Sequence, residues 1–319
     1  MKAAVLYELG TLPKYDDFNA PTPQNDNEVL ITVKAASIKQ LDRMKAAGRH
    51  YTSYSSLPVT VGIDGAGILE NGTRIYAWSK TGMIAEKALV TKNQWTVLPD
   101  NIDYETAAVL PNALLGSDAA LLYRGNIQPG YTVLINGATG VTGKIAVQMA
   151  KHRGAVKVIA TGRNEEILEQ LKLMGADEVI NLNNSEDNIS SQLEQIYKST
   201  PIDIVLDYLW GSPLETIIKV IGKMPPHKTK IITVGQMAGA NINLPSSVLR
   251  STQIEILGSG IGSISPQELN NYMQKELPEA FHLAAEGRLK IDFEIVQLKD
   301  IEKIWTEKEP SGSRFVVKI

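Results

Sequence analysis

Residues 135–151 read INGATGVTGKIAVQMAK, in which Gly137, Gly140 and Gly143 stand three residues apart between an apolar run and an amphipathic one. The preceding TVLIN predicts a buried strand, and apolar residues at four-residue steps from position 141 predict a helix with one buried stripe. Glycines at such a join let the backbone approach a pyrophosphate and let the helix pack closely on the strand, while the helix N-terminus offers free N–H groups. A bare turn without a ligand is the alternative.

The chain beyond this stretch favours the phosphate site over the bare turn. Nearly apolar runs continue as KVIATG, DEVINL, IDIVLDYL, KIITVG and IEILGSG, mostly with helical patterns between them. In the second helix Asn164 is placed to cap the start and Gly175 to end it. Apolar strands that alternate with helices predict a parallel sheet covered on both faces. We therefore expect an α/β, doubly wound, Rossmann-type domain over residues 111–260.

The rest of the chain looks different. Short strands broken by Pro, Asn and Gly fill the first hundred residues, with one helix near residues 40–47. After residue 262 we expect a long helix over 266–287, a strand in DFEIVQL, a short helix over 301–308 and a last strand in RFVVKI. These pieces are expected to complete the N-terminal β domain, which would then be discontinuous, over residues 1–110 and 261–319.

The end of the second Rossmann strand predicts which dinucleotide binds. A site for NAD usually has a carboxylate about 20 residues past the glycines, where it holds the ribose hydroxyls. This chain has TGRN (residues 161–164) there. Gly162 leaves space and Arg163 supplies positive charge, so the pattern favours a ribose 2′-phosphate and the cofactor NADPH (NADP). The alternative is that Arg163 is a solvated loop residue.

Composition excludes several classes of function. The 319 residues carry a net charge of −3 with scattered basic residues, which argues against a nucleic-acid partner. Cysteine is absent, so disulfides, thiolate nucleophiles and cysteine-ligated zinc are excluded. We expect no metal site, no membrane segment or membrane partner, and a cytoplasmic protein.

Five stretches together resemble the medium-chain dehydrogenase/reductase superfamily, in its zinc-free branch of zeta-crystallin-like quinone oxidoreductases. They are the glycine stretch, LPVTVGIDGAGIL (57–69), AAVLPNALLGSDAAL (107–121), LMGADEVIN (173–181) and SGSRFVVKI (311–319). The resemblance covers nearly the whole chain. It implies a GroES-like β domain, a Rossmann domain, hydride transfer from a nicotinamide, and a homodimer joined through the sheet edge.

The positions that hold zinc in the metal-dependent members are changed in this chain. They match Lys39, the pair Ile63 and Asp64, and Asn112, and neither a cationic lysine nor an isoleucine can replace a ligand. Asp64 is expected to cap a turn. Lys39, at the former metal position, could polarise a carbonyl or donate a proton; the alternative is a surface lysine that points to solvent.

Other site residues follow from the resemblance. His50 and Tyr51 match a cleft-lining loop, where they are candidate donors alongside Lys39, although packing roles are an alternative. Met44 and Gly116 depart from the residues common in the zinc-free branch. The residues expected at the cofactor are Gly137, Gly140, Val141, Thr142, Gly143, Gly162, Arg163, Val234, Gly235, Gly258, Ser259, Gly260 and Arg314. For Arg314, a surface charge of the β domain is an equally good alternative.

The function expected from this reading is zinc-independent hydride transfer from NADPH to a small-molecule quinone or α,β-unsaturated carbonyl. The changed cleft residues leave a second hypothesis open, a catalytically weak NADPH-binding sensor or structural protein. A short-chain dehydrogenase is excluded, because its Tyr-x-x-x-Lys pair would follow the glycines, whereas Tyr76 and Lys80 precede them.

Overall fold

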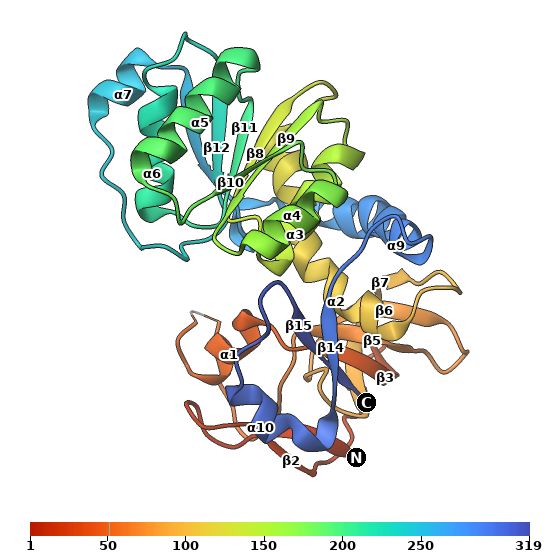
Figure 1. The fold of residues 1–319 in the computed structure, drawn as a ribbon. Helices are drawn as coiled ribbons and strands as arrows, with labels where there is room; N and C mark the ends of the chain where they lie inside the picture. The colour runs from red at the N-terminus through yellow and green to blue at the C-terminus, as the bar shows by residue number, and fades with distance from the viewer. Residues whose placement is uncertain (51) are drawn as a thin grey trace. The chain divides into compact units, whose positions relative to one another are not determined.

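The computed structural model describes residues 1–50 and 52–319, and its contacts divide the chain into two units (Figure 1). Unit 1 comprises Met1–Pro111 and Asn270–Ile319, and unit 2 comprises Asn112–Leu269. The second crossing between units lies nine residues later than the sequence suggests. Residues 261–269, which the sequence predicts to lie in the β domain, belong to unit 2.

Unit 2, every residue of which the structure describes, is built on one parallel sheet in the order β10-β9-β8-β11-β12-β13. Its strands are β8 (Thr132–Asn136), β9 (Lys157–Gly162), β10 (Glu178–Asn181), β11 (Ile204–Asp207), β12 (Thr229–Thr233) and β13 (Ile254–Gly258). The chain runs outward from β8 to one edge and then from β11 to the other. This doubly wound order confirms the Rossmann prediction, and its switch point lies between β8 and β11.

Helices cover both faces of this sheet (Figure 1). They are α3 (Val141–His152), α4 (Glu165–Leu173), α5 (Glu186–Ser199), α6 (Gly211–Ile221) and α7 (Ser246–Ser251), with a π-helical segment η1 (Ala120–Gly125) and a short 3-10 turn η2 (Ile261–Ser263). Alternate strand residues belong to separate cores: Val133 and Ile135 pack with α3 and α4, and Leu134 packs with α5 and α6. All three strand side chains are buried, which is why the strand reads as continuously apolar.

The predicted helix signals are confirmed at α4. The side chain of Asn164 accepts a hydrogen bond from Ile167 N at 3.1 Å, and Gly175 has a φ of +115° just past the last turn. An N-cap acceptor and a left-handed glycine satisfy backbone groups that the helix ends leave free.

Unit 1 holds the β-rich part of the chain. Its described strands are β1 (Lys2–Leu6), β2 (Lys14–Asp17), β3 (Glu28–Ser37), β4 (Val59–Thr60), β5 (Asp64–Ile68), β6 (Arg74–Ser79), β7 (Lys87–Val97), β14 (Phe293–Gln297) and β15 (Arg314–Lys318). The order β14-β15-β3-β5-β6-β7, with a further pairing of β3 and β7, forms a small barrel-like sheet of the GroES-like type. A smaller sheet has the order β2-β1-β4. β15 pairs with β3, so the C-terminal strands complete the N-terminal domain.

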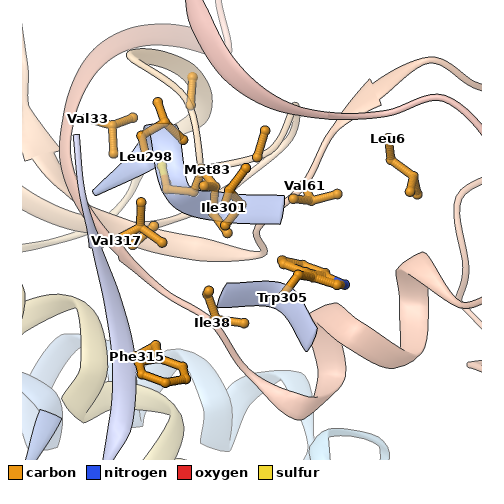
Figure 2. Close-up of a cluster of buried hydrophobic side chains, with 14 of the residues drawn as sticks. Leu6, Val33, Ile38, Val61, Met83, Leu298, Ile301, Trp305, Phe315 and Val317 are labelled. Carbon is orange, nitrogen blue, oxygen red and sulfur yellow. The ribbon is translucent and has the colours of Figure 1, made fainter. Parts of the chain in front are cut away.

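The core of unit 1 lies between this sheet and the C-terminal helix α10 (Ile301–Thr306), with η4 (Leu298–Asp300) leading into it. Figure 2 shows Ile301 and Trp305 beside Val61 and Met83 in one apolar cluster. The other helices in the described part of the chain are α1 (Gln40–Ala46), α2 (Tyr104–Leu115), α8 (Pro266–Asn271) and α9 (Leu277–Ala285), with η3 (Tyr272–Glu276) between the last two.

The helix expected over 266–287 is one helical run with a changed geometry in its middle. The π-helical η3 separates α8 from α9, and Pro278 lies in the first turn of α9. A proline has no N–H for the preceding turn, and a widened turn accommodates that loss. In the described part of the chain, no helix is both long and apolar enough to cross a membrane.

Candidate functional site

The three glycines of the turn between β8 and α3 (the glycine turn) have different structural environments. Gly137 has a φ of +89°, which only glycine adopts readily. A Cβ on Gly143 would lie 2.6 Å from the Cα of Ala138, so the helix and the strand end meet backbone to backbone. A Cβ on Gly140 would meet nothing within 4 Å, so this position borders open space.

That open space lies at the N-terminus of α3. Gly140 is the N-cap and no side chain caps the helix, so the first N–H groups of the helix have no side-chain acceptor there. Val141 and Thr142 are half-buried on the first turn. Free N–H groups and the positive end of the helix dipole bind anions, and this geometry fits a diphosphate.

The end of β9 lies next to the glycine turn. A Cβ on Gly162 would overlap the side chain of Thr139, so this glycine is required by packing and not only by the space that the sequence suggested for a phosphate. The following Arg163 is exposed, and its carbonyl accepts a hydrogen bond from Asn183 Nδ2 at 2.7 Å. Arg163 therefore stands in solvent at the strand end where the sequence placed it.

A cavity of about 200 Å³ adjoins the same strand end. The side chains of Leu182, Ile189 and Ile217 are among its apolar walls, and Thr161 and Asn184 contribute polar groups. Glu186 also lines it, and Lys219 Nζ lies 2.8 Å from Glu186 Oε1, so the two charges offset one another. An apolar slot with a few polar groups suits a flat heterocycle.

The carboxyl ends of β11, β12 and β13 continue this edge of the sheet. Val234 N donates to Asp207 O at 2.8 Å, and a Cβ on Gly235 would lie 2.6 Å from Tyr208 O. Cβ atoms on Gly258 and Gly260 would meet nothing within 4 Å. Because the strands are parallel, these segments share an edge with the glycine turn, which is where open α/β sheets bind ligands.

Gly116 also contacts the glycine-turn helix. A Cβ on Gly116 would lie 3.0 Å from Thr142 Cγ2, and its carbonyl accepts a hydrogen bond from the Tyr208 hydroxyl at 2.8 Å. A larger residue at this position would press on the first turn of α3. Packing against Thr142 therefore accounts for a glycine at position 116.

In unit 1, the structure contradicts one of the two expectations for Lys39, that of a surface lysine pointing to solvent. Its side chain is 2% exposed, and its Nζ lies 2.6 Å from Asp64 Oδ1, 3.0 Å from Ser37 O and 3.7 Å from Asp42 Oδ2. It is therefore not a solvated surface lysine, and two protein oxygens lie within hydrogen-bond distance of its ammonium. Lys39 is one partner of a buried ion pair.

The expectation that Asp64 caps a turn is wrong. Asp64 begins β5 and is buried beside Lys39. Burial raises the pKa of the Asp64 carboxyl, and the attraction of the Lys39 ammonium acts against this rise. Asp42 is fully buried and accepts hydrogen bonds from Lys39 N at 2.9 Å and Ile63 N at 3.0 Å. Two carboxyl groups thus lie beside the buried ammonium and give it the partners that a buried charge requires.

The other candidates in unit 1 have local partners or lie near this pair. His50 Nδ1 is 2.8 Å from Thr52 Oγ1, a contact within one turn. Tyr51 lies outside the described residues. Arg314, at the start of β15, is half-buried; burial lowers the pKa of its guanidinium, and the carboxylates of Glu309 first, and then of Asp64 and Asp42, act against this. Arg314 therefore belongs electrostatically to the neighbourhood of Lys39.

Sequence reasoning missed the polar residues at the ends of three central strands, Asn136, Thr161 and Asp207. All three are buried and joined by hydrogen bonds. The available signal was a polar residue at the end of an otherwise apolar strand. Among the residues that the structure describes, no group of three or more His, Asp or Glu side chains could hold a metal ion.

Comparison with known proteins gives concordant results. Residues 141–280 match the family model described as zinc-binding dehydrogenase. The chain is 27% identical over 286 residues to the quinone oxidoreductase of Rattus norvegicus, with 85% of this chain and 84% of the relative covered. It is 29% identical over 269 residues to that of Sus scrofa, covering 80% and 79%. The quinone oxidoreductase of Thermus thermophilus, solved alone and in complex with NADPH, superposes with a TM-score of 0.78 at 24% identity, over all of both chains.

The close approach at Gly143 predicts a stability effect. Gly143→Ala should lower the free energy of unfolding by about 1–3 kcal/mol, because its Cβ would press on the Ala138 backbone. Urea unfolding measures this change. Gly140→Ser is the matched control: its Cβ has open space and its hydroxyl can cap α3, so stability should not fall. Equal losses in both variants would contradict the packing argument.

The buried ion pair predicts strong energetic coupling. Lys39→Met should cost about 3–5 kcal/mol, because it leaves Asp42 and Asp64 buried without the ammonium. Asp64→Asn should also destabilise, and the double variant should lose clearly less than the sum of the two single losses. Urea unfolding of the four proteins gives the coupling energy. Additive losses would show that Lys39 and Asp64 do not act as a pair.

Proposed function

We propose that the chain is a member of the quinone oxidoreductase family of medium-chain dehydrogenases/reductases and transfers hydride from NADPH to a quinone or an α,β-unsaturated carbonyl without zinc. The similarity to zinc-binding dehydrogenases and to quinone oxidoreductases supports an oxidoreductase that acts on a small molecule. The observation that carries the cofactor proposal is the β8–α3 turn, with its open N-terminus and its close-packed glycines.

The residues of unit 2 fit a dinucleotide along the carboxyl edge of its sheet. The first N–H groups of α3 hold the diphosphate, and the cavity beside Thr161 receives the adenosine end. The segments after β12 and β13 border the nicotinamide end. When bound, the nicotinamide supplies the hydride; the protein binds, orients and shields it.

Preference for NADPH over NADH rests on Arg163. Its exposed guanidinium follows Gly162, at the strand end where a carboxylate selects the unphosphorylated ribose. A guanidinium forms charge-assisted, often bidentate hydrogen bonds with a phosphate, whereas a carboxylate at the same position would repel the phosphate. Glu186, the acidic residue that lines the cavity, is paired with Lys219 and adds little repulsion.

Zinc independence rests on the composition of the former metal position. Lys39 occupies it with its own positive charge, already paired with Asp64. The ion pair also limits how Lys39 can act, because its ammonium is engaged by protein oxygens. This engagement favours the second candidate function, a catalytically weak NADPH-binding protein. Homodimerisation and a cytoplasmic location stay predictions of the sequence.

Turnover with two acceptors tests the proposed reaction. The protein should oxidise NADPH in the presence of an ortho-quinone or a small enone, as followed by the loss of nicotinamide absorbance. Added zinc or a chelator should leave the rate unchanged, and a metal requirement would overturn the zinc-free assignment. Tight NADPH binding with neither acceptor reduced would reject the reductase in favour of the weakly catalytic binding protein.

Arg163→Ala tests the cofactor preference. The variant should bind NADPH roughly 10- to 100-fold more weakly and NADH with unchanged affinity, because only NADPH carries the 2′-phosphate. Titration of both cofactors gives the dissociation constants. Arg250→Ala, which removes another exposed arginine of unit 2, should change neither. Equal weakening of NADPH and NADH by Arg163→Ala would refute the phosphate role.

A further inference from the structure

Three neighbouring strands of unit 2 end in buried polar side chains. Asn136 ends β8, Asp207 ends β11, and Thr161 is the penultimate residue of β9. Their exposed fractions are 0%, 0% and 1%. The strands are adjacent in the order β9-β8-β11, so the three side chains lie at the switch point of the sheet. Buried polar groups are costly unless they are hydrogen-bonded, so their partners define what they do.

Hydrogen bonds connect these side chains in one direction. Gly137 N donates to Thr161 Oγ1 at 3.2 Å, and Thr161 Oγ1 donates to Asn136 Oδ1 at 2.7 Å. Asn136 Nδ2 then donates to Asp207 Oδ1 at 2.7 Å. The first glycine of the diphosphate turn is thereby linked, through two side chains, to a buried carboxylate on a different strand.

The same carboxylate holds the turn between β11 and α6. Leu209 N lies 3.2 Å from Asp207 Oδ1, and Trp210 N lies 3.0 Å from Asp207 Oδ2. Trp210 has a φ of 55°, a region that costs a non-glycine residue energy and that tends to persist where surrounding contacts enforce it. A Cβ on Gly137 would lie 2.9 Å from Leu209, so this strained turn packs directly against the glycine turn.

We propose that Asp207 is a positioning residue for the cofactor, whose carboxylate fixes the glycine turn and the Leu209–Trp210 turn in one geometry through Asn136 and Thr161. This inference rests on the proposed function, in that the cofactor's diphosphate is the group that the positioned glycine turn binds. Asp207 acts through other residues and does not itself touch the cofactor.

The chemistry of the network requires an acceptor at position 207. The groups that face its two oxygens are N–H donors from Asn136, Leu209 and Trp210. An ionised carboxylate accepts from all of them, whereas the amide of an asparagine would turn its own NH₂ toward at least one donor. Asp207→Asn is nearly the same in size, so it breaks the network without creating a cavity.

An exchange of the two residues supplies a rescue. In the double variant Asn136→Asp with Asp207→Asn, the new amide can donate to the new carboxylate, which still accepts from Thr161. The amide oxygen of the asparagine introduced at position 207 can still accept from Trp210 N. Most links of the network are restored with the donor and acceptor reversed, so a defect caused by the network should be partly repaired. A defect that reflects only the loss of charge at position 207 should remain.

The matched control lies at the other end of the same strand. Asp203 precedes β11; its Oδ2 accepts from Thr132 N at 2.7 Å, and its Oδ1 lies 2.8 Å from His227 Nε2. Asp203→Asn perturbs a comparable hydrogen-bonded carboxylate at the edge of the sheet opposite the glycine turn. It should therefore leave cofactor affinity unchanged.

Two measurements on the full-length protein test the proposal. Titration should show that Asp207→Asn weakens NADPH and NADH by the same factor, roughly tenfold, since the diphosphate is common to both. Hydrogen exchange without cofactor should show faster exchange in peptides spanning residues 137–143 and 208–211. The double variant should recover part of the dinucleotide affinity and part of the protection from exchange, and Asp203→Asn should alter neither quantity.

The outcomes separate this proposal from the proposed function. Unchanged affinities, a loss confined to NADPH, or unchanged exchange in the glycine turn of Asp207→Asn would each overturn the positioning role. If the wild-type protein binds NADPH but reduces no acceptor, the proposed reductase activity is rejected. The cofactor titration and the hydrogen exchange still decide the role of Asp207 in that case. Wild-type protein that binds neither dinucleotide would overturn both the cofactor assignment and the cofactor role of Asp207, and the exchange measurement would then show only whether the two turns are coupled.

Discussion

The backbone contact between α3 and the end of β8 is the constraint on which the candidate cofactor site depends. At Gly143 the helix meets Ala138 with no room for a side chain. This contact brings the N-terminus of α3 to the carboxyl edge of the sheet, beside the open position at Gly140. The other strands of the doubly wound sheet then present their carboxyl ends along the same edge. The cavity beside Thr161 and the loops that follow β12 and β13 lie along this same edge.

Recognition of the cofactor divides into two physical tasks. Arg163 stands exposed at the end of β9, and in the proposed function it acts by charge, so that it distinguishes ligands that carry a phosphate there from ligands that do not. Asp207 is buried and linked to the glycine turn by a chain of hydrogen bonds, and in our proposal it fixes the shape of the turn that every dinucleotide meets. Loss of the exposed charge should therefore weaken binding of NADPH alone, whereas disruption of the buried network should weaken binding of NADPH and NADH alike.

Burial also determines the chemistry of Lys39. A lysine enters a protein interior only with partners, and here Asp64 and Asp42 supply them. The ammonium that the sequence placed at a former metal position is held by protein carboxylates, so its charge is balanced within unit 1. Because these carboxylates engage the ammonium, Lys39 is less able to donate a proton to the oxyanion that develops on an acceptor. This is the physical reason for retaining a catalytically weak NADPH-binding protein as the second candidate function.

The sequence by itself determined the fold, because its signals are local. Apolar strand runs, the cap at Asn164 and the glycine at position 175 each act within a few residues, and the structure has them where the patterns placed them. The glycine turn could be predicted from the sequence for the same reason, because its pattern lies within a few residues. Only the tertiary structure paired Lys39 with Asp64 and linked Asn136, Thr161 and Asp207. These contacts join residues about 25 to 71 positions apart, and no local pattern specifies which buried charge or amide meets which partner.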